Sequence, residues 1–105
     1  QIQAADWWDL AKPIFAEVCT GPVTTTIGHA GEAEGSCILA LTPESVRRDR
    51  LELVPGVTDN PARATAAKGR RILNAGAAAL AKRLQEMAAQ PGREVVGIPM
   101  FERHE

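Results

Sequence analysis

The sequence has few aromatic residues, little net charge and no long apolar run. These scarcities limit the composition of its core and the kinds of partner it is expected to bind. Aromatics make up 4% of the 105 residues, so a buried core has to rely on Ala, Leu, Ile and Val. The net charge of −1 argues against a protein that binds nucleic acid through phosphate contacts. No run of about 18 apolar residues is present, and no basic-then-apolar signal segment begins the chain. We therefore expect a cytoplasmic protein with no nucleic-acid or membrane partner.

Cysteine is also scarce, and its placement does not indicate a metal site. Cys19 and Cys37 lack the spacing of metal ligands, and a disulfide between them would be unusual in the cytosol. We interpret both as buried thiols.

The chain length allows one compact domain at most, and the 45% hydrophobic content argues against disorder throughout. The first residue is Gln1 rather than Met, which suggests a segment of a longer product, processing, or disordered upstream residues.

Apolar residues at helical spacing predict three helices and little sheet. The predicted helices cover residues 9–18, 32–41 and 63–89, with one further helical turn over residues 43–46. Residues 2–8 could end a strand or begin a helix, residues 51–54 could form a short strand, residues 23–31 read as a loop, and the tail over residues 93–105 is expected to dock. These helices need a covering layer, so the chain could be a helical bundle or the helical half of an α/β domain.

Local signals refine the first and last of these helices. Asp9 is a plausible cap for the first helix, with Pro13 tolerated in its first turn. Gly69 and Gly76 lie inside the long helix, where each costs about 1 kcal/mol relative to Ala if exposed. We therefore expect another element to pack closely on the glycine face.

The residues best suited to chemistry are His29, Glu32 and Glu34, near the expected start of the second helix. Imidazole and carboxylate groups hold divalent metals and move protons. The two carboxylates stand two positions apart, so on a regular helix they point about 200° apart and cannot face one metal together. One is expected to face a site. The alternative is that Glu32 caps the helix and His29 is an ordinary loop histidine.

A second candidate is the pair Trp7 and Trp8. On a strand, adjacent side chains face opposite sides, so one ring would reach the core and the other a pocket. The alternative is that both rings are packing residues.

Three blocks of the sequence resemble the creatininase (creatinine amidohydrolase) family. Residues 28–36, Gly-His-Ala-Gly-Glu-Ala-Glu-Gly-Ser, and residues 38–46 are similar to the family's His-Ala-Gly-Glu, Glu-Thr-Ser, Leu-Ala-Leu and Pro-Glu-x-Val sequence. Trp7-Trp8-Asp9 resembles a Tyr/Trp-Trp-Asp segment upstream of it. Residues 64–71 resemble the family's Ala-Thr-Ala-x-Lys-Gly start of the last long helix. The blocks occur in order, from about Trp7 to about Met87.

The resemblance implies that residues 1–105 form a single partial domain, the C-terminal half of a three-layer α/β/α creatininase-like fold that is mostly helical within this chain. It implies a homo-oligomeric, metal-dependent amidohydrolase with two divalent metal ions, zinc, manganese or iron, which activate water for attack on a small amide or cyclic amide. By the resemblance, His29 is the catalytic proton shuttle, Trp8 lines the substrate pocket, and Glu34 lies at or next to the metals.

The sequence also departs from the family pattern. Family members carry a Glu-x-His pair, an Asp and an Asn-Gly-His segment upstream, which supply most metal ligands and are not found here. The expected partner is therefore the missing N-terminal part of the same protein or a complementary chain. Creatininase itself has a further Trp where residues 23–26 stand, and Gly35 replaces the family's Thr, so the substrate could be another amide, a lactone or a peptide. The alternative is a non-catalytic helical association module or an inactive remnant of the family.

Overall fold

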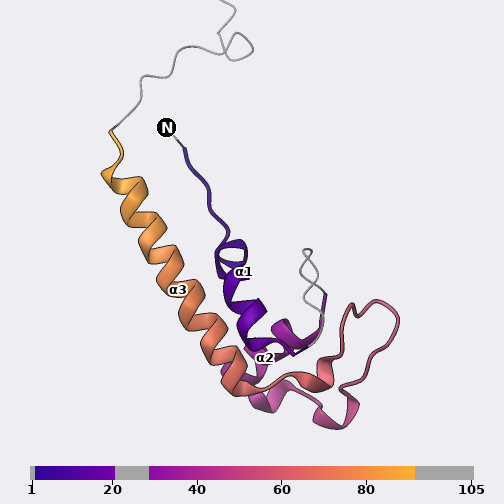
Figure 1. Ribbon diagram of the computed structural model, residues 1–105. Helices are drawn as coiled ribbons and strands as arrows, with labels where there is room; N and C mark the ends of the chain where they lie inside the picture. Colours follow the sequence, from indigo (N-terminus) through magenta and orange to yellow (C-terminus); the bar gives the residue numbers. More distant parts are fainter. Residues whose placement is uncertain (1, 21–28, 92–105) are drawn as a thin grey trace, which may run out of the picture.

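The computed structural model describes residues 2–20 and 29–91, and within them the chain is helical. Three α-helices are present in these ranges, and Figure 1 shows a loop with short helical turns connecting the second helix to the third. The elements are α1 (Trp7–Val18), α2 (Glu32–Leu41), η1 (Pro43–Ser45), η2 (Arg48–Arg50), η3 (Pro61–Arg63) and α3 (Ala66–Ala89). The prediction of a mostly helical chain is confirmed. The strand suggested for residues 51–54 is wrong, because these residues have no regular structure.

The start of α1 differs from the prediction. Its cap is Asp6, whose Oδ1 accepts a hydrogen bond from the Trp8 backbone N–H at 2.8 Å. Asp9 lies in the first turn instead and forms an ion pair with Lys12 at 2.7 Å. Pro13 consequently lies inside the helix, where it cannot donate to the carbonyl four residues earlier.

The second and third helices are closer to expectation. Both ends of α2 match the predicted range, and the turn at η1 follows it as predicted. The long helix begins at Ala66 rather than at Arg63, because η3 forms a separate turn and Thr65 then caps α3. The Thr65 hydroxyl oxygen accepts the Lys68 backbone N–H at 3.2 Å.

The core lies where α1 and α2 pack against the N-terminal half of α3. Its centre is Ile72 of α3, which has no exposed surface. The buried residues that form this cluster with it are Ala11, Phe15, Val18 and Cys37. The expectation of buried thiols holds fully for Cys37, whereas Cys19 is only half-buried, and both are free.

The two glycines of α3 mark its closest contacts, as predicted. A Cβ at Gly69 would lie 1.8 Å from the Ser36 carbonyl oxygen, and one at Gly76 would lie 2.7 Å from the Trp7 ring. Only glycine therefore lets α2 and α1 approach α3 so closely.

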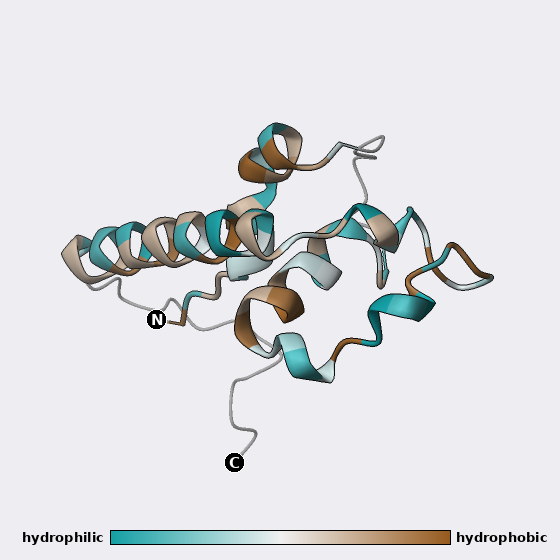
Figure 2. Ribbon diagram, turned by 90° about the horizontal axis from the view of Figure 1, so that it is seen from below, coloured by the Kyte–Doolittle hydropathy of each residue, from teal (hydrophilic) through white to brown (hydrophobic). Residues whose placement is uncertain are grey.

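Beyond Gly76 the last helix continues past α1 and α2 (Figure 1). In Figure 2, hydrophilic and apolar residues alternate along its whole length. Leu84, in this part of α3, is 54% exposed. None of the helices in the described ranges is long and apolar enough to cross a membrane. The predictions for the loop up to residue 28 and for the tail lie outside the described residues.

Candidate functional site

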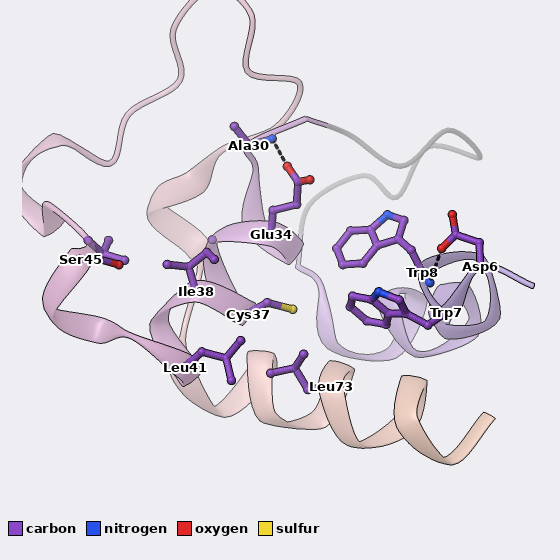
Figure 3. Close-up of a pocket in the computed structure, with 12 residues that line it drawn as sticks. Asp6, Trp7, Trp8, Ala30, Glu34, Cys37, Ile38, Leu41, Ser45 and Leu73 are labelled. Atoms are coloured by element: carbon purple, nitrogen blue, oxygen red, sulfur yellow. Dashed lines mark hydrogen bonds between the residues drawn. The ribbon is translucent and has the colours of Figure 1, made fainter. Parts of the chain in front are cut away.

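A pocket of about 810 Å³ opens between the first turns of α1 and one face of α2 (Figure 3). Residues on its walls come from segments that are far apart in the sequence. They are Asp6, Trp7, Trp8, Ala30, Glu34, Gly35, Cys37, Ile38, Leu41, Ser45, Val46 and Leu73. The pocket therefore joins the Trp-Trp motif to the motif that contains the two glutamates.

Both tryptophans line this pocket, although only one was expected to. They belong to a helix rather than a strand, so their side chains diverge by about 100° instead of facing opposite sides. The two rings meet edge to face, with centroids 5.2 Å apart. The Trp8 ring also packs against Phe15 of the core, with centroids 4.6 Å apart. Trp8 therefore packs on the core through Phe15 and also lines the pocket. Figure 3 shows its ring beside that of Trp7.

Glu34 brings a carboxylate to the pocket. It is at the third position of α2, and its Oε2 accepts the backbone N–H of Ala30 from the turn that leads into the helix. A glutamate at this position commonly reaches back over a helix start. In Figure 3 the side chain of Glu34 points from α2 toward Ala30.

Cys37 follows Glu34 by about one helical turn and lines the same pocket. Burial raises the pKa of its thiol, and the negative charge of Glu34 raises that pKa further. Cys37 is therefore a neutral thiol at physiological pH. With Ile38 and Leu41, it gives the pocket an apolar wall.

Glu32 points away from the pocket and is 1% exposed. Its Oε1 accepts hydrogen bonds from the Lys68 ammonium at 2.8 Å and from the Thr20 hydroxyl at 3.1 Å. The Thr20 backbone N–H also donates to this carboxylate, at 2.9 Å. The prediction that the two glutamates diverge is confirmed. Lys68 of α3 is thus the charged partner of the buried Glu32.

His29 lies beside the pocket rather than on its wall. It is exposed and precedes Ala30, which does line the pocket. Its backbone is bonded at both polar atoms to Thr58. The His29 N–H donates to the Thr58 hydroxyl oxygen at 2.7 Å, and the Thr58 N–H donates to the His29 carbonyl at 3.2 Å. No motif or periodic pattern in the sequence marks Thr58 as a functional residue.

A metal centre needs more donors than these residues provide. Within residues 2–20 and 29–91, no three His, Cys, Asp or Glu side chains lie together in a way that could hold a metal ion. Glu34 places one carboxylate at the pocket, as expected for one ligand of a larger set of metal ligands. Its role as a ligand stays a prediction, as do the roles of His29 and Trp8.

The pocket thus joins two tryptophans of α1 to Ala30 in the turn before α2 and to Glu34 in its first turn. A family model for creatininase, described as creatinine amidohydrolase, matches residues 1–84. The chain belongs to the creatininase family, and the resemblance seen in the sequence is confirmed. No curated protein and no solved structure matches the chain significantly.

Proposed function

We propose that this chain forms the substrate-side part of a metal-dependent amidohydrolase that cleaves a small amide or cyclic amide. Family membership over residues 1–84 supports a hydrolase. The observation that carries the proposal is the pocket, because it brings Trp8 and Glu34 together from separate sequence motifs.

Each residue of the pocket has a role in this proposal. The flat indole of Trp8, fixed by Phe15, provides a surface on which a planar amide can stack. The exposed imidazole of His29 carries a proton between the attacking water and the leaving nitrogen. Glu34 supplies a carboxylate at or next to the metals. Two divalent ions, zinc, manganese or iron, would lower the pKa of a bound water and so supply the nucleophile.

The remaining ligands belong, in this proposal, to the missing N-terminal part of the same protein or to a complementary chain. The same partner would bring the strands of a three-layer α/β/α fold against the helices seen here. A cytoplasmic homo-oligomer is proposed on the family resemblance.

The replacement His29→Ala tests the proposed chemistry in the assembled enzyme. General acid–base catalysis contributes about 10²–10⁴-fold to rate, so the rate of hydrolysis should decrease by a factor in that range. Because the side chain is exposed, the circular dichroism spectrum and melting temperature should not change. Glu44→Ala, on an exposed turn outside the pocket, is the matched control. Unchanged turnover in His29→Ala would rule out the proton-shuttle role.

A second candidate is a helical association module without catalysis. The exposed Leu84 on the outer half of α3 favours it. The two candidates differ in one respect, because only the first requires divalent metal and amide hydrolysis. A panel of amides, lactones and short peptides would then define the substrate class.

A further inference from the structure

The turn that carries His29 has an unfavourable backbone conformation. Ala30 has a φ of 56° and, among the residues that the structure describes, is the only residue other than glycine with a positive φ. Side chains with a Cβ are disfavoured in this left-handed region. Such a conformation persists only where the surroundings determine it, and it is concentrated at functional sites. The contacts around Ala30 therefore need explanation.

Thr58 holds the residue before Ala30. Its hydroxyl oxygen accepts the His29 N–H at 2.7 Å, and its own N–H donates to the His29 carbonyl at 3.2 Å. The hydroxyl hydrogen in turn points to Asp59, with its oxygen 3.2 Å from Asp59 Oδ1. The Thr58 hydroxyl is thus used both as acceptor and as donor, which fixes its orientation.

Asp59 holds the residues after Ala30. Its Oδ2 accepts the backbone N–H of Glu32 at 2.9 Å. The same carboxylate lies directly against Gly31, where an added Cβ would come 1.8 Å from Oδ1. An alanine at position 31 would therefore displace the Asp59 carboxylate from its place beside the turn.

The turn has further attachments. The Ala30 N–H donates to Glu34 Oε2 (Figure 3), and the Glu32 side chain is held by Lys68 of α3 and by Thr20, which follows α1. Thr58 and Asp59 come from the loop between α2 and α3. They hold the turn by its backbone, so they add an attachment separate from these.

We propose that Thr58 and Asp59 are positioning residues that fix the backbone of residues 29–32 and so set where the His29 imidazole stands beside the pocket. This rests on the proposed function of His29 as the proton shuttle. Neither residue touches substrate in this proposal. They act through His29, by keeping its backbone in the one conformation that the left-handed Ala30 allows.

The test compares Thr58→Val, which has nearly the same shape but no hydroxyl, with Thr58→Ser, which keeps the hydroxyl. The first measurement is hydrogen exchange of the His29 amide by NMR in the full chain. Exchange should be about tenfold faster in Thr58→Val and unchanged in Thr58→Ser, because the lost acceptor had protected this N–H. Equal exchange in all three proteins would show that the attachment does not form and would overturn the proposal.

The second measurement is hydrolysis by the assembled enzyme. Thr58→Val should lower kcat about 10- to 100-fold with little change in KM, since positioning errors reduce the chemical step. In a His29→Ala background, Thr58→Val should cause no further loss, whereas a general structural defect would add its own. A loss of kcat of equal size in both backgrounds would contradict positioning through His29.

The outcomes separate this proposal from the proposed function. If His29→Ala itself leaves turnover intact, the proton-shuttle role fails, and the positioning proposal fails with it even if the amide is protected. If His29→Ala abolishes turnover but Thr58→Val does not reduce it, the proposed function stands and the positioning proposal is wrong. If Thr58→Val lowers the melting temperature markedly, the same kinetic comparison is made with Asp59→Ala, with and without His29→Ala. In Asp59→Ala the Glu32 N–H loses its acceptor.

Discussion

Glu32 and Glu34 are two residues apart in one helix, yet they have opposite surroundings. Glu32 is buried against Lys68 and Thr20, whereas Glu34 lines the pocket. The cause is the helical repeat, which separates alternate residues by about 200°. One carboxylate therefore joins three segments of the chain, and the other remains close to the pocket.

The buried Glu32 also affects the nearby thiol of Cys19. Burial, together with the negative charges of Glu32 and Asp59, raises the pKa of Cys19 from 9.0 to about 11. Alkylation by iodoacetamide requires the thiolate. In the folded chain the rate at Cys19 should rise tenfold per pH unit up to about pH 11, and in urea it should level off near pH 9.

Peptide mapping by mass spectrometry distinguishes Cys19 from Cys37 in this experiment.

The same pKa shift has a consequence for stability, with the sign fixed by linkage. Because the folded pKa is the higher one, the unfolded chain loses its proton first, so this contribution to stability is lost as the pH rises from 9.0 to about 11. A folded-state alkylation rate that levels off near pH 9 would refute the shift.

At the scale of the helices, local signals predicted α2 to the residue but misplaced the start of α1. Asp6 and Asp9 are both acceptable caps, so local preference does not choose between them. Tertiary packing does, because including Trp7 in the helix places its ring against Gly76 of α3. This contact between distant segments cannot be inferred from sequence spacing.

The same limit explains which parts of the site the sequence could indicate. His29, Trp8 and Glu34 lie in motifs that resemble a family, so they could be named in advance. Thr58 and Lys68 reach their partners across 29 and 36 positions of sequence. No local pattern marks such long-range hydrogen bonds, and Thr58 in particular lies in a loop without periodicity.

The glycine contacts between helices predict a graded series of stabilities. Gly69→Ala should be the most damaging, since its Cβ would meet the Ser36 backbone, which cannot turn aside, and overpacking costs about 1–3 kcal/mol or more. Gly76→Ala should cost less, because its Cβ meets the Trp7 ring, which can shift. Gly35→Ala is the matched control, with its nearest contact at 3.1 Å.

In this control the gain in helix propensity, about 1 kcal/mol, should offset the mild crowding. Urea unfolding of the three variants measures the free energies of unfolding. Equal losses at Gly69 and Gly35 would show that α2 does not lie as close to α3 as the structure has it.

At the scale of the whole molecule, the described residues are well packed at one end of α3 and more exposed toward the other. α1 and α2 cover the N-terminal half of α3, while Leu84 farther along is exposed. The pocket belongs to the packed end, where Ile72 is completely buried. The described residues thus provide a fixed pocket wall and a carboxylate, but too few donors for a metal.

The central claim, that this chain is part of a metal-dependent amidohydrolase, is tested most directly by its metal content. The measurement is inductively coupled plasma mass spectrometry on the purified protein, together with any polypeptide that co-purifies and completes the site. The account predicts about two divalent ions per complete site, a lower content in Glu34→Gln and no change in Glu44→Gln. A complete assembly that binds no divalent metal would contradict it.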